Sequence, residues 1–248
     1  MVIAALEQVE VAYGARGKAL GPFDLTLEAG EIVALVGPTG CGKSTALRLL
    51  AGLEAPTAGR VQRTVGRGDT SVVFQAPTLM PWASALANVA LPLELAGRER
   101  GAARQQAVTA LARVGLAGAE QAKPAQLSGG MAMRAALARA LVSDPKLLLL
   151  DEPFAALDEI TRRALADDVH RLWAASRPAV VFVTHNVEEA VYMAGRVVVL
   201  SKGPGRLVGE IAVEGPLPRP AGFRITDAFR QAVETVSDAL ARGMAAAA

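Results

Sequence analysis

One segment of this 248-residue chain reads Gly37-Pro38-Thr39-Gly40-Cys41-Gly42-Lys43-Ser44 and matches the pattern G-x-x-x-x-G-K-[ST] without a mismatch. The segment 31–36 before it predicts a short buried strand, and residues 46–51 after it predict a helix. In that context the glycines let the backbone wrap closely, so that successive N–H groups face a phosphate at the helix N-terminus. Lys43 would reach the β- and γ-phosphates, and Ser44 would offer its hydroxyl to Mg²⁺. The segment from Gly37 to Thr45 therefore predicts a site for ATP with Mg²⁺, and a plain strand-to-helix turn is the minor alternative.

The single cysteine of the chain, Cys41, lies inside this loop. One cysteine excludes an internal disulfide and favours a reducing, intracellular setting. We interpret Cys41 as a small filler of the loop. Its place at a helix N-terminus is expected to lower the pKa of the thiol somewhat.

A second candidate site follows four leucines, where Asp151 and Glu152 end the apolar run 147–150. Ligands bind at the carboxyl ends of strands in open parallel sheets. Asp151 can hold Mg²⁺, directly or through water, and Glu152 can polarise the attacking water. The alternative is a solvated strand end before the turn at Pro153, which the leucine run and the upstream loop make the weaker interpretation.

The hydrophobic pattern predicts strands alternating with helices, and hence an α/β fold with a parallel sheet covered on both faces. Strands are expected across 2–36, twice within 59–74, at 146–150 and at 179–183. Helices are expected at 98–116, from Ser128 to the stop at Asp144-Pro145, at 159–175 and at 226–242, where Gly243 would end the last one. The charges around His170 place it on a helix surface, without a function.

Composition sets the broad class of the protein. Apolar residues make up 52% of the chain, and 26 basic residues balance 24 acidic ones to a net charge of +2. This is typical of a soluble globular protein and shows no basic footprint for nucleic acid. The longest uncharged stretch, 70–93, contains Pro77, Pro81 and Pro92, which are expected to break any helix there and to exclude a membrane span. A GTPase is excluded because neither asparagine, Asn88 or Asn186, begins an Asn-Lys-x-Asp motif.

Further motifs extend the pattern over nearly the whole chain. Leu127-Ser128-Gly129-Gly130-Met131 resembles the signature sequence of ABC ATPases, and Val183-Thr184-His185 resembles their histidine switch. Gln75 at a strand end and Ala156-Leu157-Asp158 after the carboxylates complete the ordered set. Met131 departs from the commoner Gln of the signature, which puts one polar contact in doubt.

The resemblance implies a P-loop NTPase fold of the ABC type, with a mostly parallel central sheet, an antiparallel β subdomain and a helical subdomain. Within one domain, 1–248, it implies a nucleotide-binding core with the β subdomain in 1–75 and 146–215. The helical subdomain with the signature would occupy 76–145, and a C-terminal helical tail would occupy 216–248.

The resemblance also implies roles for matching residues. Tyr13 would stack on adenine, Gln75 would ligand Mg²⁺ or its water, and His185 would contact the γ-phosphate. Ser128, Gly129 and Gly130 would face the γ-phosphate of ATP bound by a second ATPase subunit, and Asp158 would reach across that dimer. Each has a plain alternative: Tyr13 as a strand-edge aromatic, Gln75 as a surface residue, His185 as a core histidine.

The segments 76–82, 184–191 and 197–206 resemble those of nitrate, sulfonate and taurine importers. The resemblance implies an ATP-hydrolysing subunit at the cytoplasmic face of the inner membrane. Its partners would be an identical ATPase chain, a permease docking near Gln75 to Trp82 and, indirectly, an extracytoplasmic solute-binding protein. Trp82 could instead be buried core. An exporter or vitamin importer subunit stays open, and a soluble ABC ATPase without a transport role is less favoured because the chain has one cassette and no heptad run.

Overall fold

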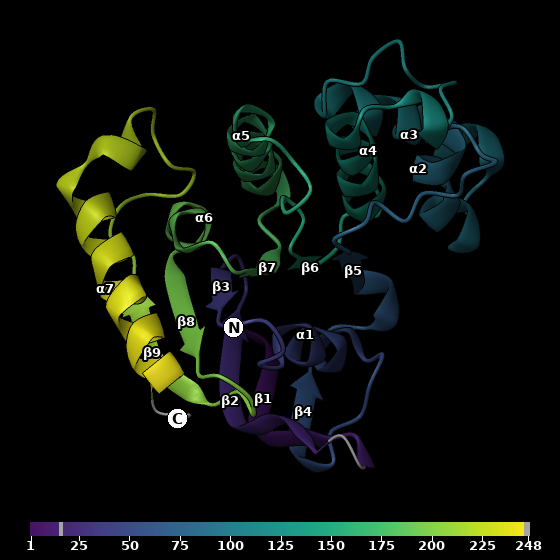
Figure 1. Cartoon of the computed structure of the whole chain (residues 1–248). Helices are drawn as coiled ribbons and strands as arrows, with labels where there is room; N and C mark the ends of the chain where they lie inside the picture. The colour runs from purple at the N-terminus through teal and green to yellow at the C-terminus, as the bar shows by residue number, and fades with distance from the viewer. Residues whose placement is uncertain (15–16, 246–248) are drawn as a thin grey trace.

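A six-stranded sheet in the order β5-β6-β7-β3-β8-β9 forms the centre of the computed structural model, which describes residues 1–14 and 17–245 (Figure 1). All neighbours in this sheet run parallel except the last pair, β8 with β9. The mostly parallel α/β sheet predicted from the sequence is thereby confirmed. The strands are β3 (Ile32–Val36), β5 (Thr70–Val73), β6 (Leu147–Asp151), β7 (Ala179–Thr184), β8 (Arg196–Leu200) and β9 (Leu207–Ala212).

Alternate residues of the central strands face two different hydrophobic cores. In β3, Ala34 and Val36 belong to one core, whereas Val33 and Leu35 belong to the other. A strand buried on both faces needs apolar residues at every position, which is why β3, β6 and β7 read as unbroken apolar runs. The central sheet is therefore covered on both sides, as the sequence predicts.

One face of the sheet is covered by the helix α1 (Lys43–Ala51) and by a second, antiparallel sheet in the order β2-β1-β4. Its strands are β1 (Val2–Ala12), β2 (Lys18–Glu28) and β4 (Ala58–Arg63). Gly52 ends α1 in the left-handed conformation, and its N–H bonds the carbonyls of the last turn. The helix α1 and the strands β1, β2 and β4 thus build a layer over the central sheet, on the side of the glycine loop.

The opposite face packs against α5 (Glu159–Ser176), α6 (Val187–Met193) and α7 (Asp227–Ala245). The expectation that Gly243 ends the last helix is wrong, because α7 continues to Ala245. A Cβ at position 243 would lie 2.8 Å from Cγ2 of Val208. Gly243 therefore serves close packing of α7 on β9 rather than helix termination.

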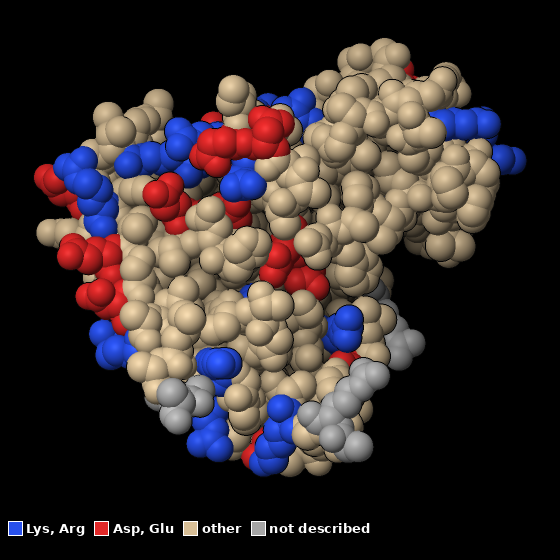
Figure 2. All heavy atoms as spheres, in the orientation of Figure 1, with Lys and Arg blue, Asp and Glu red and all other residues tan. Residues whose placement is uncertain are grey.

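The helices α2 (Ala85–Leu95), α3 (Arg100–Arg113) and α4 (Gly129–Leu141) form a group with its own hydrophobic cluster, and the other side of α4 packs into the core shared with α5 and α6. Figure 1 shows this group on the side of the molecule away from α7. In Figure 2 it projects beyond the core and leaves an indentation in the outline. Short 3-10 helices at 67–69, 124–126 and 223–225 lie in connections. Among the described residues, no helix is long and apolar enough to cross a membrane.

The expectation that the prolines break any helix within 70–93 is wrong for Pro92, which lies inside α2. Pro92 removes one helical hydrogen bond. Ser84 caps the helix, and the buried side chains of Ala85, Val89 and Ala90 belong to the hydrophobic cluster that holds it in the helical group. Tertiary packing outweighs the lost bond here.

His170 is buried at 2% exposure, so the expectation of a helix-surface histidine is also wrong. Its Nε2 lies 3.0 Å from the carbonyl oxygen of Met193, and its ring stacks on Tyr192. Burial lowers the pKa of His170 below its ordinary value. Next to it, the buried guanidinium of Arg219 donates to the carbonyls of Tyr192 and Ala194 in α6 and its C-terminal cap, so the segment after β9 is fastened to α6.

Candidate nucleotide-hydrolysis site

The glycine loop lies between the end of β3 and the start of α1, where the sequence places it. Gly40 and Gly42 have φ angles of 80° and 98°, a region that favours glycine. A Cβ at Gly37 would lie 2.7 Å from Sγ of Cys41, and one at Gly42 would lie 2.6 Å from the carbonyl oxygen of Ala19. The three glycines are therefore required by geometry, and the loop presents bare backbone to whatever it binds.

Lys43 is held inside this loop, with only 5% of its surface exposed. Its Nζ donates to the carbonyl oxygens of Gly37 and Pro38 at 2.7 and 3.0 Å. Among the described residues no carboxylate forms an ion pair with it. A buried cation without a counter-charge is a site for an anion, and a nucleotide phosphate fits both its charge and the backbone around it.

Ser44 and Asp151 meet across the site from distant parts of the chain. The hydroxyl of Ser44 donates to Oδ1 of Asp151 at 3.0 Å. Burial raises the pKa of Asp151, although the hydrogen bond from Ser44 acts in the opposite direction. A hydroxyl and a carboxylate beside a phosphate loop are the oxygen donors that Mg²⁺ takes together with substrate phosphates. The pair therefore fits the predicted metal position.

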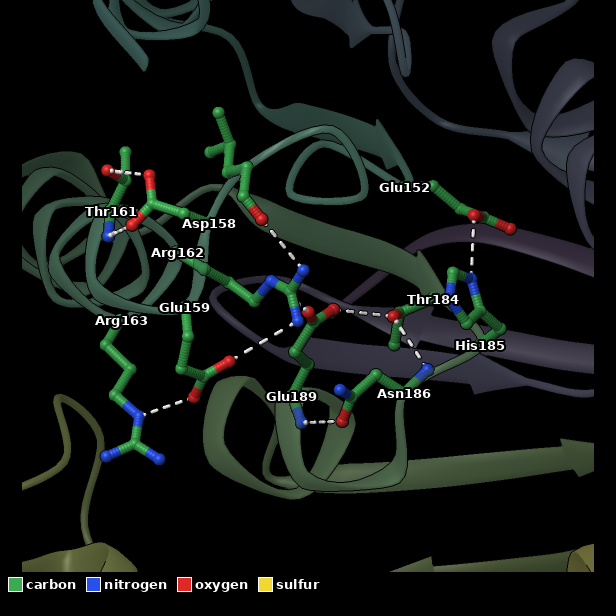
Figure 3. Close-up of polar contacts among 11 residues, drawn as sticks. Glu152, Asp158, Glu159, Thr161, Arg162, Arg163, Thr184, His185, Asn186 and Glu189 are labelled. Carbon is green, nitrogen blue, oxygen red and sulfur yellow. Dashed lines mark hydrogen bonds and ion pairs between the residues drawn. The ribbon is translucent and has the colours of Figure 1, made fainter. Parts of the chain in front are cut away.

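Glu152 and His185, predicted separately, are in contact: Nδ1 of His185 lies 2.9 Å from Oε2 of Glu152 (Figure 3). They come from the carboxyl ends of the neighbouring strands β6 and β7. Glu152 has a positive φ of 46°, and its N–H donates to the carbonyl of Val183 at 2.9 Å. A non-glycine residue in this region is strained and is typically retained at functional sites. The pair places an acceptor and a polar ring at the edge where the phosphate loop opens.

Asp158 and Ser128 cap two helices. Asp158 accepts from the N–H and the hydroxyl of Thr161 at 3.0 and 2.6 Å, and these bonds, led by that from the hydroxyl, lower the pKa of Asp158. Ser128 accepts from the N–H of Met131 at 3.2 Å, as its capping role predicts. A Cβ at Gly130 would lie 2.7 Å from Cγ2 of Thr161, so the two helix starts are packed together in one chain.

The remaining predicted residues lie outside these contacts. Tyr13 follows β1 with 39% of its surface exposed, and Gln75 is exposed two residues beyond β5. Thr39 is exposed at the tip of the loop, and Thr45 is buried in α1. In the part of the chain that the structure describes, no side-chain hydrogen bond joins Tyr13 or Gln75 to the other site residues.

The expectation of a lowered pKa for Cys41 is wrong. The thiol is fully buried, and burial raises its pKa more than nearby Lys43 lowers it. Cys41 is therefore an unreactive filler beneath Gly37 in the folded state.

Two residues of the site region had no assigned role from the sequence. Arg162, one turn into α5, and Glu189, one turn beyond His185, face each other with Arg162 Nε 3.3 Å from Glu189 Oε1. Their positions four residues after Asp158 and four after His185 are the helical spacing that could have drawn attention to them.

Comparisons with known proteins agree with this geometry. A protein-family profile described as ABC transporter matches residues 20–155. The chain is 46% identical to an uncharacterized ABC transporter ATP-binding protein of Methanocaldococcus jannaschii, over 83% of this chain and 79% of the relative. It is 51% identical to the aliphatic sulfonates import ATP-binding protein SsuB 1 of Nocardia farcinica, over 81% of this chain and 78% of the relative.

Among solved structures, the ATP-binding cassette MJ0796 in a dimeric post-hydrolysis state bound to ADP and Pi is similar with a TM-score of 0.76. The two are 31% identical, and the match covers 86% of this chain and all of that one. Sequence profile, relatives and fold agree with the phosphate loop and the carboxylates at the sheet edge. The chain therefore belongs to the ABC transporter family, as an ATPase subunit that binds ATP with Mg²⁺.

Proposed function

We propose that this chain energises an ABC importer of a small solute, a sulfonate or a chemically related compound such as taurine or nitrate. The observation that carries the ATPase part is the pair Glu152–His185 beside the pair Ser44–Asp151, at the mouth of the loop that buries Lys43. Direction and solute class are supported by the relatives named as sulfonate import ATP-binding proteins, at 47–51% identity. An exporter or a vitamin importer is the alternative.

The residues divide the work of hydrolysis. The loop from Gly37 to Thr45 binds the phosphates through backbone N–H groups, and Lys43 turns its ammonium from the loop carbonyls to the β- and γ-phosphates. Ser44, Asp151 and Gln75 would hold Mg²⁺, and the bound ion would supply charge neutralisation of the phosphates. Glu152 accepts a proton from the attacking water, and His185 holds the γ-phosphate in line with it. Tyr13 stacks on the adenine.

The second half of each site comes from another ATPase subunit, which we propose to be an identical chain. Ser128 caps α4, Gly129 and Gly130 begin it, and the backbone N–H groups of such a first helical turn suit a γ-phosphate. Asp158 lies beside them at the start of α5. One chain carries both halves, so two copies in a symmetric pair complete two sites.

The permease is proposed to dock on the loop 76–82. Trp82 is 73% exposed, so the alternative of a buried core tryptophan is wrong. Arg139 of α4 donates to the carbonyl oxygens of Thr78 and Pro77 at 2.8 and 3.0 Å, and Asn88 accepts from the N–H of Met80 at 2.7 Å. The loop is thus fastened to the signature helix and presents a large apolar ring, a typical interface anchor.

Replacing Trp82 with Asp is expected to remove most of the complex with the membrane subunits while ATP affinity of the isolated chain stays within about twofold, because the ring lies outside the phosphate loop. Co-purification of the tagged subunit with its permease measures the complex. Leu95→Asp is the matched control, since Leu95 is 78% exposed at the end of α2. Unchanged assembly of the Trp82 variant would remove the docking proposal.

Import itself is tested by deleting the gene in its host and supplying an alkanesulfonate or taurine as sole sulfur source, or nitrate as sole nitrogen source. We expect growth on one of them to stop, and wild-type protein but not Glu152→Gln to restore it. Growth on all three without the gene would contradict the solute class. The ATPase would be tested separately by phosphate release. In this proposal the subunit lies at the cytoplasmic face of the inner membrane and meets an extracytoplasmic solute-binding protein only through the permease.

A further inference from the structure

Two parts of the site that are separate in the sequence are joined by a network of polar side chains (Figure 3). One part is Asp158 at the start of α5, and the other is His185 in the turn between β7 and α6. The network consists of Arg162 on α5 and Glu189 on α6, neither of which has a role in the proposed hydrolysis. On the face drawn in Figure 2, basic and acidic side chains are interspersed over this region rather than gathered by sign.

Arg162 holds the backbone just before Asp158. Its Nη2 donates to the carbonyl oxygen of Leu157 at 2.9 Å, and its Nη1 contacts Oε2 of Glu159 at 3.4 Å. The third nitrogen, Nε, points toward Glu189 at 3.3 Å. This Nε is buried and makes no hydrogen bond of good geometry with residues 1–14 or 17–245, so its contact with Glu189 is an ion pair rather than a directed bond.

Glu189 holds the residues on both sides of His185. Its Oε2 accepts from the hydroxyl of Thr184 at 2.6 Å, and that same hydroxyl accepts from the N–H of Asn186 at 3.0 Å. The side chain of Asn186 in turn accepts from the N–H of Glu189 at 3.1 Å. The hydrogen bonds of Glu189 and its neighbours therefore stabilise the turn that contains His185. The imidazole of His185 projects from this turn towards Glu152.

Stability alone explains this arrangement poorly. The side chains of Glu189 and Arg162 are 12% and 24% exposed, and replacing such a pair by apolar residues of similar volume is often neutral or stabilising. Burial also raises the pKa of Glu189, although Thr184 and Arg162 act against it. The cost of burying a carboxylate here is offset by what it contacts: the turn of His185 on one side and, through Arg162, the backbone of Asp158 on the other.

We propose that Glu189 and Arg162 are positioning residues that set the His185 turn and the Asp158 turn relative to each other. A displacement of the Asp158 turn by a second subunit would thereby change the position of the His185 turn and of the His185–Glu152 pair. This inference rests on the roles proposed above for His185 and Asp158. It adds a physical link between the subunit interface and the hydrolytic pair within one chain.

Glu189→Gln keeps the shape of the side chain and removes its charge. We expect kcat of the ATPase to fall about tenfold, while the affinity for ATP stays within about twofold, because coupling between contacting residues has this size and the phosphate loop is untouched. Glu188→Gln, on the exposed neighbouring position, is the control and keeps the wild-type kcat. Loss of ATP affinity in parallel with kcat would indicate a general structural role and overturn the proposal.

A double-mutant cycle with His185→Ala identifies the route. If Glu189 acts through the His185 turn, Glu189→Gln lowers kcat by less than about twofold once His185 is absent. If the fold-losses in kcat of the two single variants multiply in the double variant, the two residues act independently. That result would contradict the coupling between Glu189 and His185 but not the role of either residue. A wild-type rate for His185→Ala by itself would instead contradict the role proposed for that histidine. Arg162→Lys keeps the charge but loses the planar fork that reaches both Leu157 and Glu189, so it should lower kcat as Glu189→Gln does, whereas Arg163→Lys should not.

Discussion

Replacing Glu152 with Gln lowers steady-state ATP turnover by about a thousandfold, within the range for losing a general base. Glutamine preserves the shape and still accepts a hydrogen bond from His185, but it cannot take a proton from water. The phosphate contacts of Lys43, Ser44 and Asp151 remain, so ATP affinity is expected to change by less than about threefold. Phosphate release measures turnover, and a fluorescent ATP analogue measures binding.

Glu234→Gln is the matched control for this experiment, because Glu234 is exposed on α7, away from the carboxyl edge of the sheet. Its turnover should equal that of the wild type. A Glu152→Gln protein that hydrolyses ATP at a near-normal rate would remove Glu152 from the role of base. Equal loss of binding and turnover would show instead that the carboxylate supports the loop rather than the chemical step.

The parts of the candidate site that can be placed from the sequence alone are those whose residues are neighbours along the chain. The phosphate loop depends on glycine at fixed positions, and Gly37 and Gly42 are required because a Cβ there would clash. Asp151 and Glu152 follow a buried strand and therefore reach the edge where ligands gather. The mostly parallel sheet follows from the same alternation of apolar runs with helices, whereas the order β5-β6-β7-β3-β8-β9 comes from the structure alone.

Predicting the contact between Glu152 and His185 would also require the register between the two strands that they follow. Asp151 pairs with Val183 across β6 and β7. That pairing brings the residues just beyond each strand end together, and a sequence pattern contains no register between parallel strands that are joined through a helix. The link through Arg162 and Glu189 has the same origin, because helices α5 and α6 carry its two halves.

The wrong predictions share a cause as well. His170 stands among charged residues of α5, which indicates a surface, yet the segment around Arg219 returns to cover it. That segment has neither helical nor strand periodicity. Gly243 and Pro92 were interpreted from local backbone preferences, which packing overrides in both places. The pKa of Cys41 is a balance of burial against a nearby cation, and only burial depends on the whole fold.

Mixing two inactive variants is expected to restore ATP binding at a site formed by both chains, which is the binding that precedes hydrolysis. In Figure 1, α4 lies in the helical group, apart from α1 and the phosphate loop of the same chain. If Ser128 serves the nucleotide of the partner chain, Lys43→Ala and Ser128→Arg damage different halves of each shared site. A dimer containing one chain of each kind then has one site with both defects and one site with neither.

The readout should not depend on hydrolysis, so both chains also carry Glu152→Gln, which traps bound ATP. Two different affinity tags isolate the mixed dimer, and ATP retained after rapid gel filtration is counted. We expect about one ATP per mixed dimer and almost none in either parent, because the helix N-terminus at Ser128 and the ammonium of Lys43 contact the same triphosphate from opposite chains. Retention no higher than in the parents would place both halves of the site within one chain. Retention by the Ser128→Arg parent itself would show that the phosphate loop holds ATP without the signature helix, and the loop from Gly37 to Thr45 would then be a complete site rather than half of one.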